Sequence, residues 1–370
     1  MARGVVVGGG VLGTFHAYQL VAAGFDVVQL EAEPSPNGAS VRNFGLLWIS
    51  GRRSGEELNA ARRARRLWEA TFAEVPGIGF RPAGSLTVAV SPEELKVMDD
   101  FALGPDAAER NIEFLEPPAI RRLNPALSDR VVGALWAPED GIVEPQKVLG
   151  ALRDHLEKSG HYRFVGNRFA TDAQPGVVVD HLGQRWEGDL VILAVGALRS
   201  GLVGSHLEAA PLRRVCLQML STAPIDGELP TAIADADSMR YYPAYLSARL
   251  EDLPARSELA ERHQIQLLVV QRADGTLTIG DTHSYEEPFD FALAEEVADE
   301  LLERVRRILA VPLAPVVRRW SGVYSQCTDD RLCYRAEALP GVWVVTGPGG
   351  RGMTCAPAIA EDTLAAAGVG

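Results

Sequence analysis

The start of the chain alternates between apolar patterns that predict a strand, a turn, a helix and a second strand. Residues 5–7 are all valine, which is typical of a buried strand, and residues 15–23 carry the apolar spacing of a helix. Between them, Gly8, Gly10 and Gly13 keep the G-x-G-x-x-G spacing, in which the first glycine permits the turn and the second lets a pyrophosphate approach the backbone. We therefore predict a nucleotide-binding unit in which the amides of a helix N-terminus face phosphate.

Glu31 follows the second predicted strand, 26–30, at the position where an adenosine ribose would lie. A carboxylate there accepts hydrogen bonds from both ribose hydroxyls and repels a 2′-phosphate. The interval from Gly13 to Glu31 favours a bound dinucleotide over the alternative, a doubly wound sheet that holds no nucleotide.

Further along the chain, the apolar pattern switches repeatedly between helical and strand periodicity. Helices are predicted at 56–74, over most of 92–111, and at 146–159 and 291–309. Strands are predicted at 84–90, 131–137, 162–165, 177–180, 190–197, 212–221, 240–245, 264–272, 277–280 and 342–346. The strand at 190–197 contains Gly196, which would let a cofactor approach closely, although packing of the strand end explains this glycine equally well.

Two glycine-containing loops carry further candidate chemistry. In residues 38–45, Ser40 and the nearby amides can bind pyrophosphate, and Arg42 and Asn43 can reach a cofactor ring or a substrate anion; a surface loop with a solvated arginine is the alternative. Residues 347–354 open onto a predicted helix, so backbone amides and the positive end of the helix dipole face an anionic group. A reduced flavin carries negative charge at its pyrimidine end and needs such a loop, whereas NAD does not.

Composition narrows the class of partner. The 370 residues are 47% hydrophobic and 23% charged, with a formal net charge of -13, which argues against nucleic acid or an anionic membrane surface as a general partner. An anionic ligand must therefore be met by local arginines. The four cysteines are scattered without C-x-x-C spacing, and no apolar run reaches transmembrane length. The N-terminus runs directly into a predicted strand. We therefore expect a cytoplasmic protein without a signal peptide.

The G-x-G-x-x-G unit with Glu31, the 38–45 loop, the segment 320–322 and the 347–357 loop together resemble the D-amino acid oxidase superfamily, which is the glycine oxidase and sarcosine oxidase type of FAD enzyme. The resemblance covers essentially the whole chain. It implies an α/β (α+β) fold class, with a Rossmann-type FAD-binding domain and a second, mainly antiparallel-sheet substrate domain. The implied FAD-binding domain is discontinuous, at 1–80, 141–210 and 320–370, and the substrate-binding domain lies at 81–140 and 211–319.

Finer features of the resemblance concern the substrate and the flavin. Residues 39–48 and 280–283 look most like a small bacterial subgroup associated with phosphonate breakdown, in which N-methylated 2-aminoethylphosphonate is one candidate substrate. Glycine and D-amino acid oxidases place a substrate-carboxylate arginine shortly after the Trp-x-Gly segment, but 323–326 contains none, which disfavours a simple α-amino acid. The sarcosine oxidase branch attaches its flavin to a cysteine where this chain has Gly322, so we expect non-covalent FAD, with Cys327 close by in sequence.

The resemblance implies that a hydride moves from the carbon beside an amine nitrogen to flavin N5 and that the resulting imine hydrolyses. This chemistry needs no protein nucleophile and no metal. We expect a small amine that carries an anionic group as substrate and molecular oxygen as electron acceptor. A dehydrogenase with another acceptor and a non-catalytic FAD-binding protein are the alternatives, and the sequence predicts no oligomeric state.

The predicted site residues fall into two groups. Those expected to hold or orient the substrate, because they can bind an anion or donate a hydrogen bond, are Arg351, Arg240, His283, Tyr242 and Arg42. Those expected to bind the cofactor are Gly8, Gly10, Val11, Leu12, Gly13, Glu31, Ala32, Ser40, Arg42, Asn43, Gly45, Leu46, Gly196, Gly349, Gly350, Gly352, Met353 and Thr354. For Arg351 the alternative is contact with cofactor or solvent only, and for His283 it is a structural role.

Overall fold

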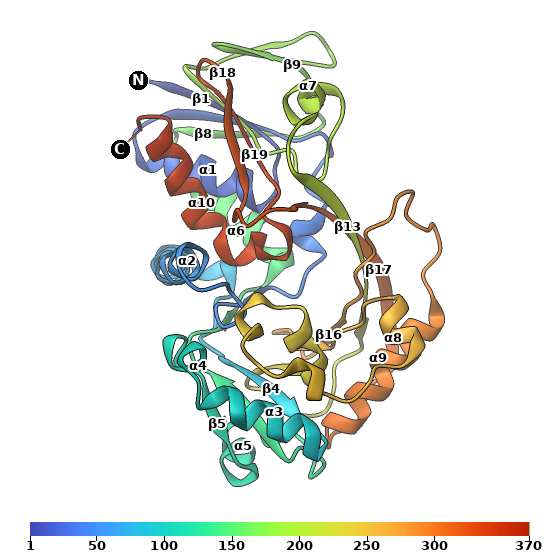
Figure 1. The fold of residues 1–370 in the computed structure, drawn as a ribbon. Coiled ribbons are helices and arrows are strands. Elements are labelled where there is room, and N and C mark those ends of the chain that lie inside the picture. Colours follow the sequence, from blue (N-terminus) through green and yellow to red (C-terminus); the bar gives the residue numbers. More distant parts are fainter. Residues whose placement is uncertain (370) are drawn as a thin grey trace.

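The first of two large sheets is built around the N-terminal strand. The computed structural model describes residues 1–369 (Figure 1). Its six-stranded sheet has the order β18-β19-β12-β1-β2-β8. Five strands run parallel and β18 is antiparallel at the edge. Their bounds are β1 Arg3–Val7, β2 Asp26–Leu30, β8 Tyr162–Val165, β12 Leu190–Leu193, β18 Tyr334–Leu339 and β19 Val342–Thr346. Parallel strands are buried on both faces, which explains why β1 and β12 consist almost entirely of apolar residues.

Both faces of this sheet are covered. One face packs on helices α1 Val11–Ala22, α2 Glu56–Glu74, α6 Pro145–Glu157 and α10 Gly352–Ala366. The other face packs on a three-stranded antiparallel sheet, β9 Ala170–Gln174, β10 Val177–Asp180 and β11 Arg185–Glu187. Among residues 1–369, no helix is long and apolar enough to cross a membrane.

The second large sheet has eight strands in the order β17-β13-β16-β15-β14-β4-β6-β5. Only the pair β14 and β4 is parallel among the described strands of this sheet. The bounds are β4 Ser85–Ala89, β5 Glu113–Leu115, β6 Gly133–Ala137, β13 Leu212–Thr222, β14 Ala232–Asp235, β15 Leu268–Gln271, β16 Leu277–Gly280 and β17 Val316–Cys327. The predicted fold class, a parallel nucleotide-binding sheet with a second, mainly antiparallel sheet, is therefore confirmed.

A long helix covers the outer face of the second sheet. This helix is α9, Glu295–Ile308, which buries Val297, Leu301 and Val305 against the sheet. The shorter helices of the chain are α3 Pro92–Ala102, α4 Pro105–Glu109, α5 Pro117–Leu123, α7 Gly204–Leu207 and α8 Glu258–Arg262. A two-stranded ribbon, β3 Leu46–Leu47 with β7 Gly141–Ile142, lies where the chain leaves and re-enters the first unit.

Some predicted elements differ from the structure. The predicted strand at 240–245 is wrong, because this segment forms two short 3₁₀ helices, Ala236–Arg240 and Pro243–Tyr245. Asp235 caps the first, accepting a hydrogen bond from Ser238 N, and Pro243 cannot donate to a ladder. The predicted domain boundaries stay a prediction; β17 crosses the boundary at 320, since the whole strand pairs with β13.

Candidate functional site

A cavity of about 1070 Å³ runs between the loops at the carboxyl ends of the first sheet and the inner face of the second. Its volume is at the upper end of the range of about 300–1,000 Å³ that is typical of small-molecule sites, which suits an elongated ligand such as a dinucleotide. The cavity is lined at one end by the turn after β1 and at the other by side chains from β13, β17 and the segment after β16.

The turn after β1 requires two of the predicted glycines. Gly8 has φ +109°, and a Cβ there would lie 2.2 Å from the carbonyl oxygen of Ala194 on the neighbouring strand end. A Cβ on Gly13 would lie 2.0 Å from the carbonyl oxygen of Gly8, so only glycine lets α1 pack this closely behind the turn. This is the backbone arrangement that leaves helix amides free to meet a pyrophosphate.

The predicted ribose-binding carboxylate lies at the edge of the same turn. Glu31 lines the cavity, and its Oε2 accepts from Gly9 N at 2.7 Å while its Oε1 accepts from Glu33 N at 3.1 Å. These bonds fix the carboxylate, and each oxygen keeps a lone pair for a ribose hydroxyl. Ser40 Oγ accepts from Val11 N at 2.9 Å and so ties the 38–45 loop to the glycine turn. The residues present therefore fit the adenosine diphosphate half of FAD.

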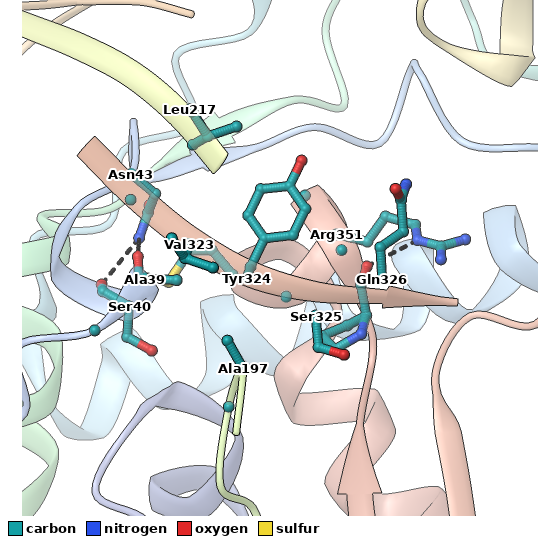
Figure 2. Close-up of a pocket in the computed structure, with 18 of the residues that line it drawn as sticks. Ala39, Ser40, Asn43, Ala197, Leu217, Val323, Tyr324, Ser325, Gln326 and Arg351 are labelled. Atoms are coloured by element: carbon teal, nitrogen blue, oxygen red, sulfur yellow. Dashed lines mark hydrogen bonds between the residues drawn. The ribbon is translucent and has the colours of Figure 1, made fainter. Parts of the chain in front are cut away.

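The 38–45 loop is held in place by its own side chains. Asn43 donates to the carbonyl oxygens of Ala39 and Ser40, both at 2.9 Å, and accepts from Gly45 N at 2.7 Å, as Figure 2 shows for the first two bonds. Arg42 donates to Ser321 O at 3.0 Å, which joins the loop to β17. Asn43 and Arg42 both line the cavity, so the loop forms a fixed wall along it.

The glycine-rich loop before α10 forms the opposite wall. Gly349, Gly350, Gly352 and Met353 line the cavity at the N-terminus of this long helix. Trp68, fully buried in α2, donates through Nε1 to the carbonyl oxygens of Met353 and Thr354 and anchors the start of α10. The positive end of the α10 dipole therefore faces the cavity, as the stabilisation of a reduced flavin requires.

Most of the predicted cofactor residues line this cavity. Among them, Gly13, Gly45 and Thr354 do not. Gly13 packs α1 against the turn, and Gly45 has φ +64° with Val143 O 2.2 Å from where a Cβ would be. Thr354 Oγ1 accepts from Trp48 N at 3.0 Å and so links α10 to the segment after β3. The structure thus gives these three residues positions behind the cavity wall.

The predicted substrate arginines line the cavity but are bonded to protein acceptors. Arg351 donates to Pro348 O, to Glu57 Oε2 at 2.9 Å and to Arg331 O, one bond from each nitrogen. Arg240 donates in the same way to Asp237, Leu250 O and Pro254 O. Three of the five N–H donors of each guanidinium are thus engaged by the protein, which leaves one N–H on each terminal nitrogen for an anion.

A row of neighbouring rings, the first pair edge-to-face and the next two pairs stacked, follows the second-sheet side of the cavity. This aromatic row consists of Tyr242, Tyr241, His283 and Tyr285, whose successive ring centroids lie 5.1, 4.1 and 6.4 Å apart. All four rings line the cavity, and Tyr324 on β17 adds a hydroxyl 3.3 Å from that of Tyr241. Figure 2 shows Tyr324 projecting from its strand beside Leu217. The row gives this end of the cavity an apolar face with hydroxyl groups along it.

Two arginines that the sequence did not single out lie at the two ends of the aromatic row. The guanidinium carbon of Arg52 is 5.7 Å from the Tyr242 centroid, and that of Arg213 is 4.0 Å from the Tyr285 centroid. Arg52 is 3% exposed and donates through Nε to Trp48 O; Arg213 donates through Nε to Gln326 Oε1.

The terminal nitrogens of these two arginines are available to a ligand. Arg52 and Arg213 both line the cavity, and within the described chain their terminal nitrogens make no hydrogen bond. The nearest carboxylate to Arg52 is that of Glu57, whose Oε1 lies 3.7 Å from Nη1, beyond hydrogen-bond distance. The two residues can therefore receive anionic groups at two separate points.

Burial sets the protonation of the titratable groups beside the row. Burial lowers the pKa of His283 to about 4, so its ring is neutral near neutral pH. Burial raises the pKa of Tyr241 to about 12 and that of Tyr242 further, so both phenols stay protonated. Burial also raises the pKa of Asp281 to about 7, opposed by a hydrogen bond from Gln266. Asp281 lines the cavity and was not predicted as a site residue.

Comparison with known proteins agrees with this geometry. The family model described as FAD dependent oxidoreductase matches residues 4–366. A chain of the opine oxidase of Rhizobium meliloti is 24% identical over 386 residues, covering 97% of this chain and 93% of that protein. Glycine oxidase from Bacillus cereus ATCC 14579 is a similar solved structure, with a TM-score of 0.80 and 18% identity, and the match covers 100% of this chain and 95% of that chain. L-proline dehydrogenase from P. horikoshii is another, with a TM-score of 0.78 and 19% identity, and the match covers 100% of this chain and 94% of that chain. At these identities the structural matches show the fold.

Proposed function

Because the chain belongs to the family of FAD dependent oxidoreductases, we propose that it oxidises a small amine carrying carboxylate groups, most simply a secondary amine flanked by two carboxylates as in opines. FAD, when bound, supplies the hydride acceptor for the carbon beside the amine nitrogen. The observation that carries the proposal is the pair of arginines at the two ends of the aromatic row. The name of the Rhizobium meliloti relative supports it.

In this proposal the chain's own residues bind and orient the substrate. Arg52 and Arg213 each hold one carboxylate through their terminal nitrogens. The aromatic row excludes water along the substrate, and the carbon to be oxidised is thereby held against the flavin in one orientation. The amides of the loop that contains Gly349 and Gly350, together with the N-terminus of α10, would stabilise negative charge on a bound flavin.

Substrates with one or two carboxylates separate the two arginines. Iminodiacetate carries two carboxylates and sarcosine carries one, and both are secondary amines. We expect Arg52→Gln to raise KM for both by about 10- to 100-fold, and Arg213→Gln to do so for iminodiacetate only, since one charge-assisted hydrogen-bonded contact contributes about 1.5–3 kcal/mol. Exposed Arg130 provides the matched control, Arg130→Gln. Equal effects of Arg213→Gln on both substrates would contradict the proposal.

Reduction of the flavin by amines also tests the predicted aminophosphonate substrate, and reoxidation in air tests the electron acceptor. None of the comparisons supports a phosphonate substrate, and reduction of the flavin by N-methyl 2-aminoethylphosphonate but not by carboxylate amines would restore it. We propose molecular oxygen as acceptor and non-covalent FAD, as the sequence predicts. Peroxide formed in air in step with amine consumption, and FAD released by acid precipitation of the protein, are the expected results.

A further inference from the structure

Asp281 is a buried acid beside the aromatic row with no cationic partner among the described residues. Its Oδ1 accepts from Gln266 Nε2 at 3.1 Å, and the two backbones exchange hydrogen bonds across the strands, which fixes the side chain. Apart from Gln266, no other residue of 1–369 donates a hydrogen bond to the carboxylate, although Asp281 is 5% exposed and lines the cavity. Its second oxygen, Oδ2, therefore keeps its lone pairs for a ligand in that cavity.

We propose that Asp281 pairs with the ammonium group of the substrate and accepts its proton before the amine is oxidised. The inference rests on the proposed amine oxidation but not on the second carboxylate. An isolated buried carboxylate is costly, and a ligand that brings a positive charge and N–H donors to Oδ2 removes that cost. The row beside it carries no positive charge, because its histidine is neutral.

Each bond broken in the proposed proton transfer is matched by a bond formed. The ammonium N–H bond breaks and an O–H bond forms on Oδ2, which leaves the nitrogen lone pair free. That lone pair forms the C=N bond as the neighbouring C–H leaves with its electron pair as hydride to bound FAD. An ammonium cannot lose hydride in this way, since its nitrogen has no lone pair to give. The nitrogen must therefore lose this proton before the hydride leaves, and in this inference Asp281 accepts it.

The groups around Asp281 do not compete for this proton. The acid lies within electrostatic range of four phenols, Tyr241, Tyr242, Tyr285 and Tyr324, and burial raises the pKa of each of them. Burial keeps His283 neutral by lowering its pKa to about 4. Asp281 is thus the group beside the row whose charge changes near neutral pH.

Ligand pairs that differ only in the ammonium test the inference. Diglycolate and methoxyacetate are the ether counterparts of iminodiacetate and sarcosine, and they cannot be oxidised. Binding is read from the change in flavin absorbance, and amine oxidation from the anaerobic reduction rate, between about pH 6 and pH 9. The variants are Asp281→Asn, which keeps the shape and an acceptor for Gln266, and the control Asp154→Asn on the exposed face of α6.

The expected change of affinity with pH differs between the amines and the ethers. Affinity for the amines rises as pH increases through about 7, because ionised Asp281 binds ammonium, while affinity for the ethers stays level or falls. Asp281→Asn weakens amine binding about 100-fold at high pH, removes this pH dependence and slows reduction, and leaves ether binding unchanged or tighter. Asp154→Asn changes none of these.

The outcomes separate this inference from the proposed function. If Asp281→Asn weakens amines and ethers equally, or if amine affinity does not change through pH 7, Asp281 does not bind the ammonium and the inference is overturned. If sarcosine shows the Asp281-dependent profile but iminodiacetate does not bind, the dicarboxylate substrate fails and the role of Asp281 stands. If no amine binds or reduces the flavin, both are overturned.

Discussion

Burial of Asp281 predicts that the protein becomes more stable when this acid is replaced by its amide. Burial raises the pKa of the carboxyl from 3.8 to about 7, so the folded protein binds a proton that the unfolded chain has lost. Stability therefore falls as pH rises from about 4 to about 7 and stays low above it, with a penalty that reaches about 4 kcal/mol for full ionisation. At pH 5 the same reasoning gives a smaller penalty, about 1–2 kcal/mol.

Urea unfolding of the flavin-bound protein measures this penalty. The free energy of unfolding of Asp281→Asn should exceed that of the unmodified protein by about 1–2 kcal/mol at pH 5 and by about 4 kcal/mol at pH 9. Asp154→Asn, at an exposed position, removes the same charge and should show neither gain. A gain for Asp281→Asn that is equal at both pH values, or a loss of stability at pH 9, would refute the claim that this carboxylate is buried without compensation.

Three further substitutions, and a control for the first of them, test the framework of the site. Gly8→Ala should abolish FAD binding, because its Cβ would lie 2.2 Å from a carbonyl oxygen. The control Gly24→Ala, where φ is +86° and the space around the Cβ is open, should keep its flavin and lose about 1 kcal/mol of stability. Flavin absorbance and thermal unfolding measure the two effects. Glu57→Gln leaves two buried arginine contacts uncompensated and should lower stability by about 3 kcal/mol in thermal unfolding. Asp140→Ala removes the acceptor of hydrogen bonds from two backbone amides and two hydroxyls near Arg52. We therefore expect the protein to lose about 3 kcal/mol of stability and KM for the amine to rise. An unchanged KM would show that this acid does not position the arginine.

The nucleotide end of the site could be predicted from the sequence because its constraints are local. Gly8 and Gly13 are required by backbone approaches within one strand–turn–helix unit, and the spacing of the glycines records them. Glu31 follows the next strand directly, so its position in a parallel sheet follows from the order of elements. The second glycine loop before α10 is predictable for the same reason.

The substrate end could not be predicted because it is assembled from distant segments. Arg52, Arg213 and Asp281 come from the segment after β3, from β13 and from the end of β16, and no spacing in the sequence relates them. Within residues 280–283, the sequence predicted His283 as a substrate contact and did not predict Asp281 as a site residue. Burial lowers the pKa of His283 to about 4 and raises that of Asp281 to about 7, so the aspartate and not the histidine changes charge near neutral pH.

The arginine predictions illustrate the same limit. A sequence identifies Arg351 and Arg240 as cations near the site, but their hydrogen-bond partners are set by the tertiary structure. Glu57 on α2 and two carbonyl groups engage three N–H donors of Arg351, and Asp237 with two carbonyl groups engages three of Arg240. Whether either residue also contacts substrate stays a prediction.

The absorption spectrum of the purified protein, mixed anaerobically in turn with glycine, sarcosine, iminodiacetate, 2-aminoethylphosphonate and its N-methyl form, tests the central claim most directly. We predict the visible bands of an oxidised flavin in the protein alone and their loss on mixing with iminodiacetate, with sarcosine reacting more weakly. A protein that purifies with FAD but is reduced by none of these amines would contradict the claim that this site oxidises amines.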